Sequence, residues 1–298
     1  MITIPVSDYK HFTFAECLLF LGRSDKECMH YIQEGKLQRM IAIAEQPVLL
    51  EISEDPQKKA LVAAATPVNG QPVDETVVRQ YVSHWLHLQT DLGDFYRFAA
   101  KDPMLAPLTK QYRGLRLIGI PELFEALTWS IIGQQINLSF AYTLRQRFVQ
   151  AFGYHTVIAG KDYYLYPHPA VVAALSPEQL IPMQFSRSKA VYIIETARQM
   201  AMGNLEERAL QQMDYEAARE KLVSLKGIGN WSANYVLMKF SRFPQALPLE
   251  DAGLHNAIKK QLQLTIKPGL SDVKAYTAHW QQHAAYATFY LWRSLYGS

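Results

Sequence analysis

The sequence has few cysteines and no long apolar run. Only two cysteines, Cys17 and Cys28, occur among the 298 residues, too few for a four-thiolate iron–sulfur cluster or a disulfide framework. The first ten residues lack the basic segment and apolar stretch of a secretory signal, and no run reaches the length of a membrane span. We therefore expect a protein of the reducing cytoplasm that has no membrane partner.

Net charge is also small, at +3, but it is unevenly distributed. Residues 1–105 carry 10 Lys/Arg and 14 Asp/Glu, whereas residues 106–298 carry 20 and 13. A basic C-terminal part is typical of a protein that meets a polyanion. An excess spread over so long a segment is also ordinary scatter, so charge alone does not decide between these interpretations.

The N-terminal part alternates short apolar runs with turn signals such as Asp55-Pro56 and Asn69-Gly70. This pattern predicts a small antiparallel sheet with one or two helices. The apolar runs are Phe12–Phe14, Met40–Ile43, Pro47–Ile52 and Ala60–Ala64. The helices are expected around Ala15–Gly22 and Asp25–Glu34.

From Asp74 onwards the apolar spacing becomes helical, apart from a Tyr-rich loop expected at Lys161–Pro167. We predict an α+β fold with a small N-terminal α/β domain at residues 1–80 and a mainly helical domain at residues 81–298. The helices are expected over Asp74–Leu88, Asp91–Ala100, Pro121–Ile132, Asn137–Phe152, Pro169–Ala174, Pro177–Ile181, Ser186–Met202, Asp214–Leu225, Asn230–Phe240, Leu254–Gln261, Ser271–His283 and Ala284–Tyr296.

The most informative segment is Leu-Lys-Gly-Ile-Gly-Asn-Trp-Ser-Ala at residues 225–233. One helix, with Asp214 as its expected N-cap, ends at a Gly-Ile-Gly turn, and a second begins with Asn230 as its expected N-cap. The two glycines, Gly227 and Gly229, permit a tight turn and a close approach of the backbone to a phosphate. Such turns also connect helices that bind nothing, so the flanking residues must decide.

Three segments in order resemble the helix–hairpin–helix (HhH-GPD) DNA glycosylase superfamily, in particular its DNA-3-methyladenine glycosylase II branch. Residues 124–136 are similar to the helix and DNA-filling loop, residues 225–235 to the hairpin, and residues 247–254 to the loop that presents a catalytic aspartate. The N-terminal sheet resembles the small β domain of several such enzymes. The resemblance implies a helical glycosylase core that hydrolyses the N-glycosidic bond of a damaged, alkylated base flipped out of duplex DNA, in base excision repair.

Asp251, twenty positions after Trp231, is the candidate catalytic residue. Cleavage of the bond between base and sugar builds positive charge on the sugar, which a carboxylate stabilises while it orients water. An aspartate before a helix is more often simply an N-cap, and the two roles are compatible; Glu250 is the fallback. Trp231 stands where bifunctional relatives carry a lysine, and an indole cannot form a Schiff base, so no lyase activity is expected.

Trp231, Tyr235, Trp129 and His283 are the candidate walls of the base pocket. Aromatic faces attract a cationic alkylated purine. The resemblance places Trp231 and Tyr235 at positions that face the base, whereas Trp129, like Trp280 and Trp292, is better explained as core. His283 stands where one relative has a pocket tryptophan.

The resemblance also implies a set of DNA contacts. Gln135 is expected to fill the hole that the flipped base leaves. Main-chain carbonyls of Val223, Leu225 and Ile228 are expected to hold a monovalent cation, with no other cofactor. The candidate DNA-binding residues are Gln134, Gln135, Ile136, Lys226, Gly227, Ile228, Gly229 and Asn230.

Two other functions stay open. Residues 91–96 and 111–116 resemble segments of glycosylases for oxidised purines, although those relatives use the hairpin lysine that is missing here. A non-catalytic DNA-binding protein would use the hairpin only to grip the backbone. In each case the expected partner is double-stranded DNA, containing damaged bases if the protein is an enzyme. The protein is expected to be monomeric and nucleoid-associated in the cytoplasm.

Overall fold

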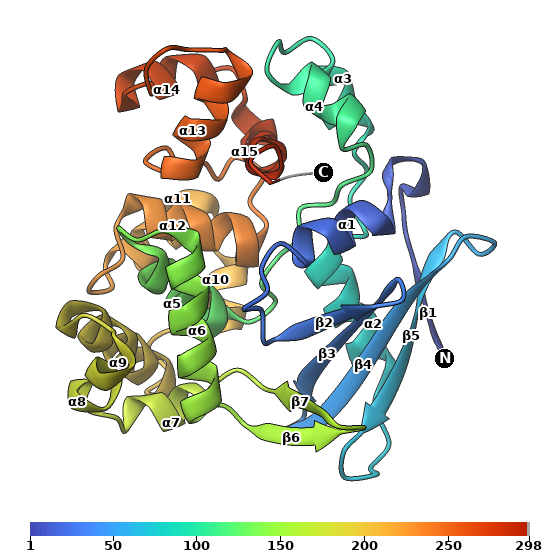
Figure 1. Ribbon diagram of the computed structural model, residues 1–298, viewed down its shortest axis with the longest axis vertical. Helices are drawn as coiled ribbons and strands as arrows, with labels where there is room; N and C mark the ends of the chain where they lie inside the picture. Colours follow the sequence, from blue (N-terminus) through green and yellow to red (C-terminus); the bar gives the residue numbers. More distant parts are fainter. Residues whose placement is uncertain (297–298) are drawn as a thin grey trace.

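The computed structural model describes residues 1–296 as a five-stranded sheet beside a larger set of helices (Figure 1). The strands are antiparallel in the order β1-β5-β4-β3-β2. This arrangement confirms the predicted α+β class with a sheet near the N-terminus. The strands are β1 (Ile2–Pro5), β2 (His30–Gln33), β3 (Lys36–Ile43), β4 (Gln46–Asp55) and β5 (Ala60–Pro67).

The helix predicted over Asp25–Glu34 is wrong, because the second half of this segment forms β2. His30 pairs with Arg39 of β3 across a two-residue turn. The turn residues Glu34 and Gly35 adopt positive φ angles of 52° and 74°. Two left-handed residues match the twist of a β-hairpin, so they pair the strands.

The helical part surrounds one edge and one face of the sheet, and α2 packs against β1. Helices α4 and α10 were not predicted from the sequence; α4 contains Pro107 in its first turn and α10 is only six residues long. In residues 1–296, no helix has both the length and the apolar character that a bilayer crossing needs. The helices are α1 (Phe14–Leu21), α2 (Glu75–Leu86), α3 (Gly93–Ala99), α4 (Leu105–Gln111), α5 (Leu123–Gly133), α6 (Leu138–Phe152), α7 (Pro169–Ala173), α8 (Pro177–Leu180), α9 (Arg187–Ala201), α10 (Glu207–Gln212), α11 (Tyr215–Val223), α12 (Asn230–Val236), α13 (Ala252–Gln261), α14 (Leu270–Thr277) and α15 (Ala284–Arg293), with short turns η1 (Tyr9–His11), η2 (Ile181–Met183) and η4 (Gln281–His283) and the π-helical η3 (Leu237–Ser241).

The Tyr-rich loop predicted at Lys161–Pro167 is instead part of a second hairpin. Strands β6 (His155–Ile158) and β7 (Lys161–Tyr164) pair antiparallel between α6 and α7. The hairpin lies against β3, where the Tyr163 hydroxyl donates a hydrogen bond of 2.9 Å to Gln38 Oε1 (Figure 1). This hairpin therefore ties the helical part to the sheet.

Buried ion pairs make a second connection between sheet and helices. Arg39 of β3 contacts Glu125 of α5 at 2.6 Å, and Arg145 of α6 contacts both Glu125 at 3.6 Å and Glu27. Burial alone would raise the pKa of Glu27, but Arg145, His30 and the Met29 backbone N–H together outweigh burial and lower it to about 2. Apolar residues of both parts share one continuous core. The boundary predicted at residue 80 lies inside α2, and the division into two domains stays a prediction.

Candidate active site

Asp251 lies where the N-terminus of α13 meets α12 and α15. Its Oδ2 accepts hydrogen bonds from the Leu254 backbone N–H at 2.7 Å and from Trp292 Nε1 at 2.8 Å. Its Oδ1 accepts a hydrogen bond from Trp231 Nε1 at 3.0 Å. The carboxylate is therefore oriented by two indoles and by the first turn of a helix, and Asp251 is only half-buried.

The local sequence explains this placement. Asp251 is the N-cap of α13, with extended backbone angles, and its own N–H bonds the Pro248 carbonyl at 2.9 Å. A Cβ atom on Gly253 would lie 2.9 Å from Asp251 Oδ2 and 3.4 Å from the Trp292 ring. Glycine at position 253 therefore lets Trp292 approach the carboxylate. The N-cap predicted at Asp251 is confirmed.

The two glycines of the hairpin between α11 and α12 have different structural requirements. Gly227 has a φ of 89°, and a Cβ atom there would lie 2.3 Å from the Tyr192 ring. A Cβ atom on Gly229 would meet no protein atom within 4 Å. Gly229, rather than the predicted Asn230, is the N-cap of α12, and the Asn230 Oδ1 accepts a hydrogen bond from Arg219 at 3.1 Å. Packing thus explains why position 227 is a glycine, but it does not explain the glycine at position 229.

Three aromatic rings extend from the Asp251 carboxylate. Tyr235 lies between Trp231 and Trp292, with ring centroids 5.8 Å and 5.9 Å away. Trp129 lies within hydrogen-bonding reach of the Tyr235 hydroxyl, whose pKa is raised by burial. Stacked rings lie about 3.5–4 Å apart, so a base between two of these rings would need a centroid spacing of about 7 Å. A base can therefore stack only on an outer face, and Trp231 is the most exposed of the four rings.

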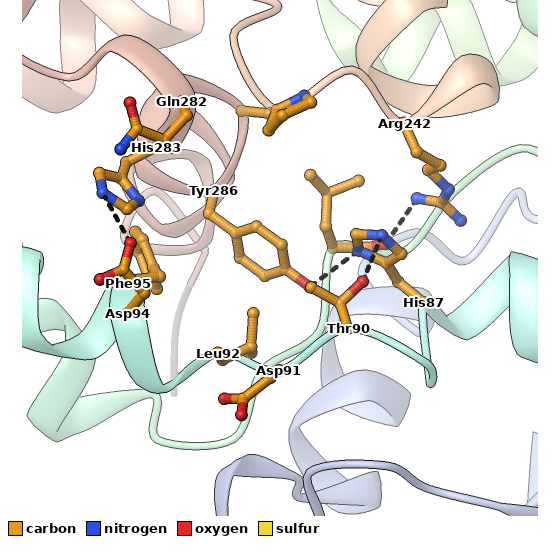
Figure 2. Close-up of a pocket in the computed structure, with 13 residues that line it drawn as sticks. His87, Thr90, Asp91, Leu92, Asp94, Phe95, Arg242, Gln282, His283 and Tyr286 are labelled. Atoms are coloured by element: carbon orange, nitrogen blue, oxygen red, sulfur yellow. Dashed lines mark hydrogen bonds and ion pairs between the residues drawn. The ribbon is translucent and has the colours of Figure 1, made fainter.

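His283 is not brought together with these rings. It stacks on Phe98 at 4.3 Å, its Nε2 lies 3.5 Å from Asp94 Oδ2, and burial lowers its pKa although Asp94 opposes the shift. It lines a separate cavity of about 300 Å³ (Figure 2). Other residues that line this cavity are His87, Thr90, Phe95, Arg242, Gln282 and Tyr286.

The loop that follows α5 presents its side chains in different directions. Gln134 Nε2 donates to the Gly227 carbonyl at 2.8 Å and lies 3.0 Å from Ser232 Oγ, so its amide joins the loop to the hairpin. Ile136 packs against the core. Gln135 is exposed and has a φ of 55°. Of these three side chains, Gln135 alone projects into solvent.

The remaining hairpin residues differ in side-chain exposure and in the hydrogen bonds that their backbone carbonyls accept. Lys226 is exposed and Ile228 is buried. The Leu225 carbonyl accepts the Ile228 N–H at 3.1 Å. Helix α11 ends at Val223, and the last carbonyls of a helix lack an intrahelical partner and carry partial negative charge. The carbonyls of Val223, Leu225 and Ile228 are therefore chemically suited to a cation.

Sequence reasoning missed two residues of this site. Trp292, interpreted as core, is separated from Asp251 by 41 positions and yet bonds its carboxylate. Arg23, in the loop after α1, places its guanidinium 4.0 Å from the Phe20 ring and 5.6 Å from the Tyr142 ring. No local pattern marks either residue, because the contacts of Trp292 with Asp251 and of Arg23 with Tyr142 join segments distant in the chain.

The chain is similar to known proteins along almost its whole length. Residues 128–281 match the family model "HhH-GPD superfamily base excision DNA repair protein", and residues 7–127 match the N-terminal domain of 8-oxoguanine DNA glycosylase. A DNA-3-methyladenine glycosylase of Bacillus subtilis is 39% identical over 99% of this chain and 97% of its own. The 3-methyladenine DNA-glycosylase structure from Archaeoglobus fulgidus has a TM-score of 0.83 at 24% identity, and the match covers 99% of this chain and 97% of that one. The 8-oxoguanine glycosylase/lyase of Clostridium acetobutylicum, solved with double-stranded DNA, has a TM-score of 0.75 at 17% identity. That match covers 96% of this chain and 92% of the other.

Proposed function

Because the chain belongs to the HhH-GPD superfamily of base excision DNA repair proteins, we propose that it is a monofunctional glycosylase for alkylated bases in duplex DNA. The observation that carries this proposal is the Asp251 carboxylate, which two indoles and a helix N-terminus hold beside the hairpin. The name of the Bacillus subtilis relative supports an alkylated purine as substrate. We propose that the enzyme acts as a monomer in the cytoplasm.

The proposed reaction breaks the bond between the sugar C1′ and the base nitrogen, and the bonding electrons leave with the base. Positive charge then develops on the sugar, and Asp251 stabilises it. An ionised carboxylate offers roughly four lone-pair positions, and three N–H donors occupy three of them. The position left on Oδ1 can orient water, whose oxygen adds to C1′ and whose proton passes to Asp251.

The proposed mechanism uses water because Trp231 supplies no amine. Its indole nitrogen donates to Asp251 and has no lone pair for attack on C1′. Together with Tyr235 and Trp129, Trp231 forms the proposed wall for the base, and its outer face is free for stacking. His283 faces another cavity and is not part of the proposed pocket.

The proposed DNA contacts divide between the hairpin and the loop after α5. The backbone N–H groups at Gly229 and Asn230 open α12 and suit a phosphate, because a helix N-terminus carries partial positive charge. The exposed Lys226 adds a positive charge beside them. Gln135 is the proposed wedge, and Gln134 supports it by anchoring the loop to Gly227.

We also propose a structural monovalent cation at the hairpin, held by the carbonyls of Val223, Leu225 and Ile228. The end of α11 at Val223 supports this site, because its terminal carbonyls face away from any intrahelical donor. Such a cation would draw the hairpin backbone together and add positive charge near the phosphate.

One specific observation favours a second candidate substrate, an oxidised purine. Residues 7–127 match the N-terminal domain of 8-oxoguanine DNA glycosylases. This stretch includes residues 91–96 and 111–116, which resemble that branch in sequence. We rank it second because Trp231 stands at the position of the lysine that the oxidised-purine branch uses.

A release assay distinguishes these candidates. The purified protein is incubated with duplexes that contain 3-methyladenine or 8-oxoguanine, and freed base is measured together with borohydride trapping. We expect release of 3-methyladenine, no trapped adduct, and no release by Asp251→Asn. Faster release of 8-oxoguanine, or an adduct in good yield, would contradict the proposal and direct attention to Lys226. Binding without any release would support a non-catalytic protein.

A further inference from the structure

Arg23 places a cation inside the aromatic cluster beside the proposed base pocket. It follows α1 directly, and its Nη1 donates to the Phe20 carbonyl at 2.7 Å. Its guanidinium carbon lies 4.0 Å from the Phe20 ring, 5.6 Å from Tyr142 and 6.0 Å from Tyr296. Among the ion pairs found in residues 1–296, none involves Arg23. The charge therefore lies against aromatic rings, and the Glu27 carboxylate acts on it only from beyond ion-pair distance.

Three polar atoms in this cluster are buried without a partner among residues 1–296, and one of them, Nε of Arg145, belongs to a guanidinium that pairs with Glu27. The Tyr142 hydroxyl, in a side chain that is only 2% exposed, has no hydrogen bond within the described part of the chain, and neither has Arg23 Nε. The Tyr142 ring also lies 5.0 Å from Trp129, one of the proposed pocket walls. Buried donors in proteins are almost always paired, so two adjacent unpaired donors suggest that an acceptor arrives with a ligand.

A chain of ring contacts connects Arg23 to the catalytic carboxylate. Phe20, which Arg23 covers, lies 4.4 Å from Phe289. Phe289 lies 6.5 Å from Trp292, and Trp292 donates to Asp251. The unpaired donors and the proposed catalytic group thus belong to one aromatic cluster, although Arg23 comes from the N-terminal part of the chain.

We propose that Arg23 and Tyr142 determine specificity by donating hydrogen bonds to a carbonyl oxygen of the flipped base. This inference rests on the proposed glycosylase function. A guanidinium has only donors, and it keeps its charge. A keto oxygen, as in a guanine derivative, accepts from it, whereas the amino group of an adenine derivative would set donor against donor. The two donors therefore add to the release of keto bases and leave the release of amino purines such as 3-methyladenine unaided.

The test compares 7-methylguanine with 3-methyladenine in single-turnover release. Both leave from positively charged nucleosides, and the ratio of variant to wild-type rate for each base cancels the difference in their intrinsic lability. Arg23→Met should lower release of 7-methylguanine at least tenfold more than release of 3-methyladenine, as expected for loss of a charge-assisted hydrogen bond. Tyr142→Phe, which removes only the hydroxyl, should shift the ratio about threefold in the same direction.

Lys26→Met is the matched control. Lys26 lies in the same loop and donates to Thr143 Oγ1 at 2.8 Å, which ties the loop to α6 without a ring contact. It should leave the ratio of the two released bases unchanged. If Arg23→Met does not fold, Tyr142→Phe decides the question.

The outcomes distinguish failure of the inference about Arg23 and Tyr142 from failure of the glycosylase proposal. If the wild type releases both bases and the variants slow both equally, the pair is structural and the inference is wrong. If the wild type releases neither base, the glycosylase proposal is wrong and the inference falls with it.

Discussion

Replacing Asp251 by asparagine should abolish base release while the protein stays folded and still binds DNA. Asparagine keeps the size of the side chain and remains a good N-cap. Its oxygen can continue to accept from Leu254 and Trp292, the two donors on Oδ2. Its amide nitrogen then faces the Trp231 N–H, so one of three hydrogen bonds is lost.

The hydrogen bonds of Asp251 set the expected loss of stability and the expected loss of rate in this variant. A half-buried donor left without its acceptor costs about 1–3 kcal/mol, a fraction of the roughly 5–15 kcal/mol that stabilises a native protein. For a chain of this size the unfolding temperature should fall by roughly 2–4 °C per kcal/mol. Loss of a group that stabilises transition-state charge typically costs about a hundredfold to a thousandfold in rate, or about 2.7–4 kcal/mol. The free-energy loss should therefore be larger in the reaction barrier than in stability, and the protein should stay folded.

The assay is single-turnover release of 3-methyladenine, with affinity for an abasic-site analogue and the unfolding temperature measured in parallel. Glu250→Gln is the matched control, because Glu250 is the exposed carboxylate next to Asp251. It should retain a rate within about threefold of the wild type, since it contacts no reacting atom. Release by Asp251→Asn within tenfold of the wild type would refute the assignment and make Glu250 the candidate.

Three further predictions follow from the geometry. Gly229→Ala should weaken duplex binding roughly tenfold without lowering the unfolding temperature, whereas Gly227→Ala should destabilise the free protein; similar effects of the two would contradict the roles given to them. Gln135→Ala should slow excision from an intact duplex more than from one with a gap opposite the lesion, and equal slowing would exclude it as the wedge. Glu27→Gln should lower the free energy of unfolding by about 3 kcal/mol at neutral pH, because the folded protein lowers the pKa of Glu27 to about 2 from an unfolded value near 4.5. This contribution is complete above the unfolded pKa, so the wild type should lose stability faster than the variant as pH falls from about 5 to about 2. If urea unfolding shows the same pH dependence for both proteins, the pair with Arg145 contributes nothing.

Local signals in the sequence predicted most helix beginnings. Asp214 and Asp251 were expected as N-caps and Asp74 and Asn137 as helix starts, and each of the four accepts a backbone N–H two or three residues later. These bonds are local, so the residues near each cap are enough to specify them. Asn230 is the exception: Gly229 is the N-cap of α12, and the Asn230 side chain accepts from Arg219 of the preceding helix.

Hairpin turns were harder to predict because several use residues without a special preference. Ala44 and Glu45 join β3 to β4 with positive φ angles, and Ala159 does the same beside Gly160 between β6 and β7. Such residues pay a steric cost in the left-handed region. The pairing of the flanking strands sustains that conformation, and it depends on the whole sheet rather than on the turn.

The order of the motifs, the Gly-Ile-Gly turn and the capping position of Asp251 could all be read from the chain, because each depends on neighbours a few residues away. The meeting of Trp292 with Asp251, the insertion of Arg23 among the rings and the removal of His283 to another cavity could not. These arrangements join segments that are distant in sequence, and their geometry depends on how the sheet and every helix pack together. Periodicity predicts that a side chain is buried, but only close packing in three dimensions selects its neighbours.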